Sequence, residues 1–330
     1  MGAVPRPGTK VPGQVDFHFN MGVAPYYHGG CSDAAYMVIL AFFFLLCSTS
    51  YVPAQSYSTF YVTKFGAVGD GKTDDSQKCP GIPPAALHFD ACNGLQLSGL
   101  SLHDNPRNHI SVNKCNSAVL SNLTIRAPGD SPNTDGIDIS NLNNIQIHNC
   151  IISTGDDCIA INNGTSNVNI SYITCGPGHG ISIGSLGGGR TYAAVQDIHV
   201  SHSNFTETKW AARIKTWKGG SGYVRGVSYK DIILNNVQRA ITINQEYDDG
   251  IYERSVVVSN VSFIGFHGTA SRSDAISMKC GPGPQRCTDV VLGDVNISSS
   301  VGQKLEAFCQ FAHGPRCTNC IPPDCVETSP

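Results

Sequence analysis

Charged residues are scarce in this 330-residue chain, at 14% of the total, and the net charge is −3 without any run of like charges. Proteins that bind nucleic acids or membrane surfaces usually carry clustered Lys and Arg, so both kinds of partner are excluded. Long amphipathic helical stretches are also missing, whereas Gly (35 residues) and Asn are frequent. This composition is typical of an all-β protein with many turns and argues against a helical bundle.

Cysteine pairs at zinc-site spacing are almost absent, although the chain has 14 cysteines. Only Cys317 and Cys320 form a Cys-x-x-Cys pair, and no second pair or suitably spaced His accompanies them. Disulfides formed in an oxidising compartment are the better interpretation. Asn-x-Ser/Thr sequons favour the same context. Their asparagines are Asn122, Asn163, Asn169, Asn204, Asn260 and Asn296.

The N-terminal segment has the features of a secretory leader. Residues 1–33 lack periodicity, and we expect them to be disordered or an extension of the gene model. Residues 34–56 are predicted to be a signal peptide, because Ala34–Cys47 is uncharged and short for a membrane span and Ala54–Ser56 offers a cleavage site. An uncleaved signal anchor is the alternative. The mature chain, residues 57–330, is expected to be one secreted domain without membrane contact.

Short runs rich in β-branched residues recur along the chain. Their starts are separated by 23, 28, 23, 29, 29, 29 and 35 residues. A steady period of this size, with Ile or Val alternating with polar residues, indicates a stacked solenoid. Crossover helices and a fixed Leu framework are missing, so we predict a parallel β-helix rather than βαβ units or leucine-rich repeats. The runs begin at Cys92, Cys115, Asn143, Ser166, Val195, Val224, Glu253 and Thr288.

Acidic and basic residues recur at intervals of about one coil. From Asp135 to Asp156 is 21 residues, and from Asp157 to His179 is 22 residues. Because residues one coil apart stack about 4.8 Å from each other, these side chains are predicted to share one face. The same spacing with one loop insertion brings Arg213-Ile-Lys215 to that face.

Each of these motifs has a plain structural interpretation: Asp-Gly and Asp-Asp as turn residues, His as a structural side chain, and Arg and Lys as solvated strand positions. Their joint occurrence resembles the polygalacturonases, pectin-cleaving glycoside hydrolases. The resemblance covers about residues 59–325. Its motifs are Asn133-Thr-Asp-Gly136, Gly155-Asp-Asp-Cys158, Gly178-His-Gly180 and Arg213-Ile-Lys215.

The resemblance implies a single-stranded right-handed parallel β-helix of the pectin-lyase-like type. It also implies inverting hydrolysis of α-1,4-galacturonosyl bonds without a cofactor or metal. Such hydrolysis needs one carboxyl group to protonate the leaving oxygen and another to activate water. By resemblance, Asp156 is the general acid, Asp135 and Asp157 hold and activate the water, and His179 tunes the protonation of the acid.

Substrate contacts and disulfides are also implied by the resemblance. Asn133 contacts the sugar, Arg213 and Lys215 bind the galacturonate carboxylate, and Tyr247 contacts the substrate. Asp248 stands where the family usually has a Cys. The implied disulfides are Cys158–Cys175 beside the site, Cys280–Cys287, and a bridge that involves Cys309 and Cys325.

One gap departs from the family pattern. Gly66–Asp75 resembles the opening of such a β-helix, but the helix that should cap the coil ends before Pro80, and several coils are missing after Gln77. An impaired or misfolded homologue that at most binds pectin is therefore the alternative function.

Two other enzyme classes are weighed against hydrolysis of polygalacturonate. Paired acids also bind Ca²⁺ in pectate lyases on the same fold, but acids combined with Gly-His-Gly favour a hydrolase. A rhamnogalacturonan hydrolase is disfavoured by the Arg213 and Lys215 pair, which suits a bare galacturonate. We expect a monomeric secreted enzyme of the cell wall, with pectin as its partner.

Overall fold

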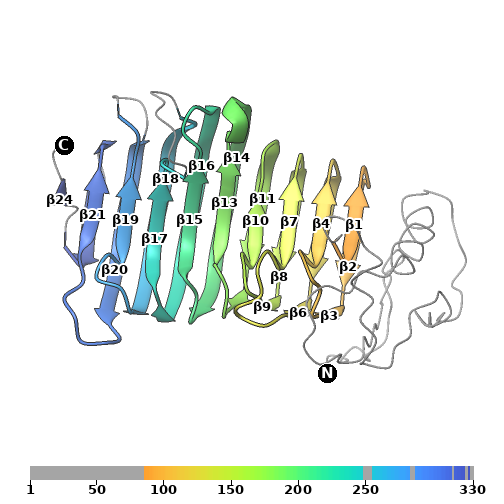
Figure 1. Cartoon of the computed structure of the whole chain (residues 1–330), viewed down its shortest axis with the longest axis horizontal. Coiled ribbons are helices and arrows are strands. Elements are labelled where there is room, and N and C mark those ends of the chain that lie inside the picture. Colours follow the sequence, from red (N-terminus) through yellow and green to blue (C-terminus); the bar gives the residue numbers. More distant parts are fainter. Residues whose placement is uncertain (1–84, 248–254, 283–286, 314–315, 324–325, 328–330) are drawn as a thin grey trace, which may run out of the picture.

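The computed structural model describes residues 85–247, 255–282, 287–313, 316–323 and 326–327, which form an elongated stack of coils (Figure 1). The predicted leader, signal peptide, cap helix and gap lie outside these residues, as do Asp248 and Cys325. The one helical segment within these ranges is the 3-10 turn η3 (Gly188–Arg190). None of the described residues thus belongs to a helix able to cross a membrane.

Each coil contributes one strand to a 10-stranded parallel sheet in which every strand pairs with the strand one coil earlier and one coil later. We call the outward surface of this sheet the site face. The strands are β1 (Leu87–Asp90), β4 (Ile110–Asn113), β7 (Ile137–Ser140), β10 (Ile159–Ile161), β13 (Ile181–Leu186), β15 (Trp210–Thr216), β17 (Arg239–Asn244), β19 (Ile276–Lys279), β21 (Ala307–Gln310) and β24 (Val326–Glu327).

The rest of each coil forms a 14-stranded parallel sheet. Its first coils contribute two short strands each: β2 (Gln96–Ser98) and β3 (Ser101–His103), β5 (Asn116–Ser121) and β6 (Thr124–Arg126), β8 (Asn143–His148) and β9 (Ile151–Ser153), β11 (Thr165–Ser171) and β12 (Thr174–Cys175). Later coils have β14 (Tyr192–Thr206), β16 (Ser221–Val237), β18 (Val257–Ala270) and β20 (Cys287–Ser299), followed by β22 (Ala312–His313) and β23 (Arg316–Ile321).

Residues with a left-handed backbone make the corners between the paired short strands. Asn122 separates β5 from β6, and Asn149 separates β8 from β9, both with φ above +50°, while Gly99 and Tyr172 take the same place in the other two pairs. Asn tolerates this left-handed conformation better than other non-Gly residues because its short side chain forms local hydrogen bonds. In β14 and β16 the equivalent bends fall at His202 and Asp231 inside one continuous strand.

A column of isoleucines holds the site face to the core. Ile110, Ile137, Ile159 and Ile181 pair in register across β4, β7, β10 and β13, and all four are fully buried. Complete burial of one such side chain contributes about 1.5–3 kcal/mol. Side chains alternate between the two faces of a strand. The residue that follows each of these isoleucines on its own strand therefore points outward onto the site face.

The predicted parallel β-helix is confirmed, and the predicted runs overlap strands of the 14-stranded sheet. The run that starts at Glu253 begins outside the described residues and is misaligned, because Val224 pairs with Val258 and Thr288 pairs with Ser259. Val258 is fully buried, so burial rather than the start of the run fixes the register. Two further starts are one residue out, since Asn143 pairs with Asn116 and Val195 with Thr165.

Disulfides staple the coils as expected at two positions, Cys158–Cys175 and Cys280–Cys287. Cys309 is also disulfide-bonded. Cys317 and Cys320 are bonded to each other, which explains this Cys-x-x-Cys pair without zinc.

Candidate active site

Two of the predicted acids and the predicted histidine stand in one row of the site face. Asp135, Asp157 and His179 each precede a column isoleucine by two residues, and those isoleucines pair in register. Asp156 lies one position earlier, so Asp157 is the residue level with Asp135. The row occupies the loops that enter β7, β10 and β13.

Glycines allow these entry loops to pack backbone against backbone. A Cβ atom on Gly155 would lie 1.9 Å from the carbonyl oxygen of Ser131, so only glycine fits before the Asp pair. Gly180, at φ +85°, comes similarly close to the carbonyl oxygen of Trp210. The buried Thr134 ties the first two loops together, since its Oγ1 accepts a hydrogen bond from the Gly155 N–H at 3.0 Å. The glycines in both motifs therefore have a packing reason.

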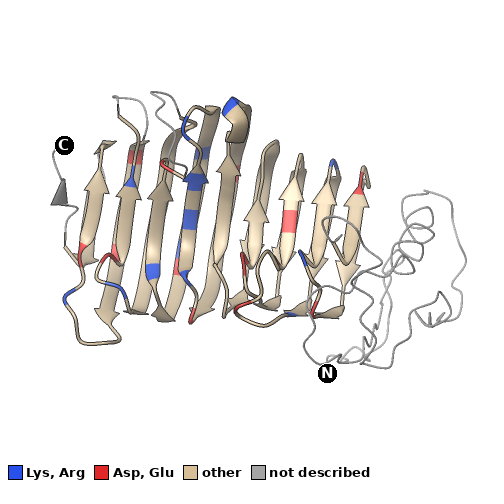
Figure 2. Ribbon diagram, viewed as in Figure 1, with Lys and Arg blue, Asp and Glu red and all other residues tan. Residues whose placement is uncertain are grey.

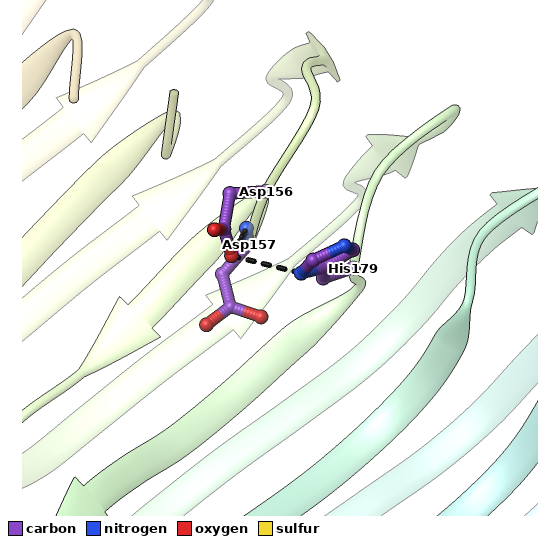
Figure 3. A group of neighbouring side chains, drawn as sticks. All are labelled: Asp156, Asp157 and His179. Atoms are coloured by element: carbon purple, nitrogen blue, oxygen red, sulfur yellow. Dashed lines mark hydrogen bonds and ion pairs between the residues drawn. The ribbon is translucent and has the colours of Figure 1, made fainter. Parts of the chain in front are cut away.

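Asp156 faces His179, with its Oδ1 2.9 Å from Nδ1 of the imidazole (Figure 3). The same oxygen accepts the backbone N–H of Asp157 at 2.8 Å. Burial raises the pKa of Asp156, but the hydrogen bond and charge of His179, together with Lys215, outweigh burial and hold that pKa below its ordinary value. Asp156 is therefore ionised in the free protein.

Both carboxylate oxygens of Asp157 have a bonding partner. Lys215 Nζ lies 2.7 Å from Oδ2, and the Ser182 hydroxyl donates to Oδ1 at 2.6 Å. All three side chains are buried, with Asp157 only 1% exposed. A buried ion pair of this kind is retained only with good geometry and further hydrogen bonds, and both are present here. Lys215 thus holds Asp157 as a carboxylate beside Asp135.

Asp135 is accompanied by Asp138, which the sequence analysis does not assign to the site. Burial and the neighbouring carboxylates, Asp138 first among them, raise the pKa of Asp135 to about 9. Burial and the charge of Asp157 raise the pKa of Asp138 to about 7, against hydrogen bonds from Asp135 and Asn108. Crowded buried carboxyl groups retain protons because they cannot all ionise together. At mildly acidic pH this pair carries protons, in contrast to Asp156.

The Asp135 backbone is fixed from the preceding coil by His109. The His109 ring Nδ1 lies 3.1 Å from the Asp135 carbonyl oxygen, and the Asn105 N–H approaches Nε2 at 3.4 Å. Burial lowers the pKa of His109, which favours the neutral ring required by this pattern of one donor and one acceptor. His109 is a structural support of the acid row.

Arg213 lies beside Lys215 on β15 and has no carboxylate within ion-pair distance among the described residues. Its guanidinium carbon is 3.6 Å from the ring centroid of Trp210, and it forms a hydrogen bond with Tyr247. Burial lowers the pKa of Arg213 from its very high ordinary value, so the side chain remains a cation. Its Nε is buried without a partner. This guanidinium is held flat on an aromatic ring and is available to an anion.

The structure also places the other two predicted substrate contacts. Tyr247 follows β17, and its ring lies 5.6 Å from the Arg213 guanidinium carbon and 5.8 Å from Lys215 Nζ. Asn133 is exposed in the loop before β7, at φ 56°, two residues from Asp135. All eight predicted catalytic and substrate-binding residues thus lie on or beside the site face.

Asp156, Asp157 and His179 are the one group of described residues able to present three metal ligands, with ligand atoms within 4.8 Å of one another. Lys215 already neutralises Asp157, and His179 Nδ1 is engaged by Asp156, as Figure 3 shows for the latter pair. A divalent cation would have to displace the buried ammonium group. The donor set therefore suits proton chemistry better than metal binding.

Charge changes sign along the site face. Figure 2 shows acidic colour on β7 and basic colour on β15, with further basic positions on β17 and β19. We call the part that contains Asp135, Asp138, Asp156 and Asp157 the acidic half. The basic half comprises Arg213, Lys215, Arg239 and Lys279. The two halves meet at β13 and β15, where Ser182 pairs with Arg213.

Sequence reasoning misses Asp138, Ser182 and Trp210. Asp138 and Ser182 each stand between a column isoleucine and the next isoleucine of the same strand. Strict alternation within the strand therefore marks both as outward-facing polar residues. Trp210 can be assigned to the site only when the strand register is known, because a loop insertion separates it from His179. The polar position between two isoleucines is the signal that would have found the first two.

Fold and site together define a parallel β-helix that carries a row of carboxyl groups next to bound cations. A profile of the family described as Glycosyl hydrolases family 28 matches residues 66–320. The chain belongs to this glycosyl hydrolase family. Its fold is the right-handed parallel β-helix of the structures to which it is similar.

Two relatives in plants illustrate the similarity. A probable polygalacturonase of Arabidopsis thaliana is 45% identical over 260 residues, which is 76% of this chain and 57% of the relative. A polygalacturonase of Persea americana is 39% identical over 231 residues, 68% of this chain and 50% of the relative. The chain thus spans about half the length of the curated relatives it matches.

Solved structures agree on the fold. The endo-xylogalacturonan hydrolase of Aspergillus tubingensis superposes with a TM-score of 0.64 at 27% identity, over 70% of this chain and 67% of that chain. A polygalacturonase of Erwinia carotovora gives 0.59 at 24% identity, over 77% of this chain and 62% of that chain.

Proposed function

We propose that this protein hydrolyses α-1,4 bonds between galacturonate units of pectin with inversion at the anomeric carbon. The observation that carries the proposal is the junction of the two halves of the site face. Carboxyl groups in two protonation states stand at the entrances to β7 and β10, and Arg213, a buried cation without a carboxylate partner among the described residues, lies on β15 beyond the intervening strand β13. An acidic sugar would supply that carboxylate beside the acids that cleave its glycosidic bond. The names of the plant relatives support this substrate.

Asp156 is assigned as the general acid. It is half-buried, and its hydrogen bond to His179 fixes the orientation of the carboxyl group. In the free protein His179 and Lys215 hold its pKa low. A galacturonate carboxylate bound at Arg213 and Lys215 would offset the Lys215 charge and exclude water, and both effects raise the pKa of Asp156. Substrate binding thereby prepares the acid to protonate the leaving oxygen.

Asp135 and Asp157 are assigned to the attacking water. They stand level on adjacent strands, so one water molecule can contact both carboxyl groups. Lys215 and Ser182 fix the orientation of the Asp157 carboxyl group, which prepares it to accept the proton of the water. Asp156 reaches the sugar from the adjacent loop position. Separate groups for acid and water fit single displacement.

Arg213, Lys215 and Tyr247 are assigned to the galacturonate carboxylate, and Asn133 to a sugar hydroxyl. A guanidinium matches a carboxylate in two parallel hydrogen bonds, and stacking on Trp210 fixes its plane before the substrate arrives. Preorganisation of this kind lowers the entropic cost of binding.

The test measures reducing-end release from polygalacturonate at about pH 5, beside fully methyl-esterified pectin and neutral galactan. Release from polygalacturonate alone, with NMR detection of the inverted anomer first, is the expected result. Asp156→Asn should remove the activity without lowering the melting temperature, and Asp274→Asn should leave activity unchanged. Retention of anomeric configuration, or equal activity on the neutral polymer, would refute the proposal. Binding without release would favour the alternative of a pectin-binding homologue.

We also propose that the protein is secreted to the cell wall as a glycoprotein after cleavage of residues 34–56. Three disulfides and a further bonded cysteine, Cys309, support this location, as do the sequon asparagines, which are all exposed. The check expresses the full chain with a C-terminal tag in plant cells. It should appear in the cell-wall fraction with a mass that falls on glycosidase treatment; retention inside cells without sugar would contradict it.

A further inference from the structure

Asp138 is the second carboxyl group of the acidic half that no proposed catalytic role uses. It lies three residues after Asp135, outward between Ile137 and Ile139, and it is half-buried, with its Oδ1 atom removed from solvent. Its Oδ2 accepts a hydrogen bond from Asn108 Nδ2 at 2.8 Å. An unused buried carboxyl group beside a proposed reaction centre requires a physical account.

The contacts of Asp138 require a proton. No N–H or hydroxyl of the described residues donates to its buried Oδ1. Its carboxyl group forms a hydrogen bond with the carboxyl group of Asp135. Two carboxylates repel each other and neither can donate, so this bond exists only when one of the two is protonated.

We propose that Asp138 is a positioning residue, which shares a hydrogen-bonded proton with Asp135 and so orients the Asp135 carboxyl group toward the attacking water. The inference deepens the proposed function and depends on it for the identity of the reaction. Asn108 fixes one oxygen of Asp138 from the preceding coil. The shared proton joins the Asp138 carboxyl group to the Asp135 carboxyl group. The Asp135 backbone is already held by His109.

Charged groups on every side of the pair favour a retained proton. Asp157 lies on β10, level with Asp135, and Asp156 precedes it; both are negative. Lys215 acts in the opposite direction, but its ammonium group is bonded to Asp157. On the preceding coil, Arg107 lowers the pKa of Asp138 weakly, and His109 is neutral. Burial and the neighbouring carboxylates therefore outweigh Lys215 and Arg107, and they stabilise the protonated pair.

The first test does not depend on catalysis. Groups whose pKa is raised in the folded state contribute stability below their unfolded pKa, about 4, and lose it as pH rises through the folded value. The melting temperature of the wild-type protein should therefore fall between about pH 5 and pH 9. Asp138→Asn, which keeps a hydrogen-bonding side chain of the same size, should flatten this fall. A pH dependence identical to wild type would overturn the shared proton even if the protein cleaves no polysaccharide.

The second test uses the pH–rate profile on polygalacturonate. The pair orients the Asp135 carboxyl group while it retains its proton, so loss of that proton adds to the fall of activity at high pH. Asp138→Asn keeps an N–H donor at every pH, so the falling limb of kcat should move to higher pH by about one unit. Asp138→Ala should also lower kcat, because the Asp135 carboxyl group loses its support. A uniform loss of kcat without movement of the limb would assign Asp138 a merely structural role and overturn the proposal.

Asp274→Asn is the matched control. Asp274 also lies beside the site face, but it pairs with Arg239 and Arg272, and these partners lower its pKa despite burial. Its substitution should leave the falling limb of kcat in place and should not flatten the fall of the melting temperature above pH 5. If wild-type protein has no hydrolase activity while the melting data separate Asp138→Asn from Asp274→Asn, the proposed function fails and the shared proton stands.

Discussion

The acidic and basic halves of the site face are built on the same parallel strands but neutralise their charges differently. In the acidic half, Asp135 and Asp138 retain protons, and Asp156 and Asp157 bond to His179 and Lys215. In the basic half, Arg239 pairs with Asp274, whereas Arg213 has only aromatic and hydroxyl neighbours. Asp156 and Asp157 thus have cationic or hydrogen-bonding partners, whereas Arg213 has no carboxylate partner among the described residues.

This difference indicates which half prepares the reaction and which half recruits the substrate. Side chains with all their partners present are preorganised and need no rearrangement. A desolvated cation without a partner gains most from a ligand of opposite charge. Lys215 belongs to both halves, since it stands on the basic strand β15 and neutralises the acid Asp157.

Removal of Lys215 should have the largest effect, because it breaks the bond between the halves. Lys215→Gln leaves Asp157 charged and buried, and we expect unfolding to become easier by about 3–5 kcal/mol at pH 7. Urea denaturation at pH 7 measures the loss. Lys304→Gln, in an exposed pair with Glu306, should cost at most about 1 kcal/mol. Equal losses in the two variants would contradict the ion pair.

Removal of Arg213 should affect substrate binding before stability. Arg213→Gln deletes charged hydrogen bonds worth about 1.5–3 kcal/mol, so KM for polygalacturonate should rise roughly ten- to a hundredfold. Steady-state kinetics check this. Arg225→Gln is the control, because Arg225 lies 4.2 Å from the Tyr223 ring centroid on the 14-stranded sheet, away from the acids. An unchanged KM in Arg213→Gln would show that the unpaired cation does not recruit the substrate.

The pH dependence of activity should show that a carboxylate bound in the basic half changes the pKa of Asp156 in the acidic half. A general acid works while protonated, so activity falls as pH rises through the pKa of Asp156. That pKa is low in the free protein, because His179 and Lys215 outweigh burial. The fall should therefore come at lower pH in kcat/KM, which reports the free enzyme, than in kcat, which reports the complex. Coincident limbs would mean that the bound carboxylate does not alter the acid.

Lys279 should give the smallest effect. It is exposed at the end of β19, in the row of Lys215, with Asn244 between them. A long polygalacturonate chain along the site face would bring another carboxylate near it. Exposed charges contribute little, so Lys279→Gln should raise KM for the polymer by at most about fivefold. Lys230→Gln, exposed on β16, should have no effect. A larger change in the control than in Lys279→Gln would limit the binding surface to β15.

The sequence was sufficient for the fold because each coil repeats the same alternation of buried and exposed residues. It also indicated the acid row, since Asp135, Asp157 and His179 stand at the same offset from column isoleucines. It was insufficient for the partners of those acids. Loop insertions vary from coil to coil, so nothing in the spacing announces that Lys215 contacts Asp157 or that Ser182 completes the pair. Asp138 went unassigned because a single acid between isoleucines matches an ordinary exposed strand position.

The 58-residue separation between Lys215 and Asp157 has a consequence for the chain as it is made. The N-terminal coils are synthesised first, so the acids of β7 and β10 emerge before β15 exists. Until then Asp157 stands near the open edge of a growing sheet, hydrated and without its cation. A negative charge at an unpaired edge repels other strands and discourages association between nascent chains. Strand β13 covers β10 first, and β15 then brings the ammonium group of Lys215 over β13 to Asp157, so we expect the charge of Asp157 to remain unpaired until two further coils are in place.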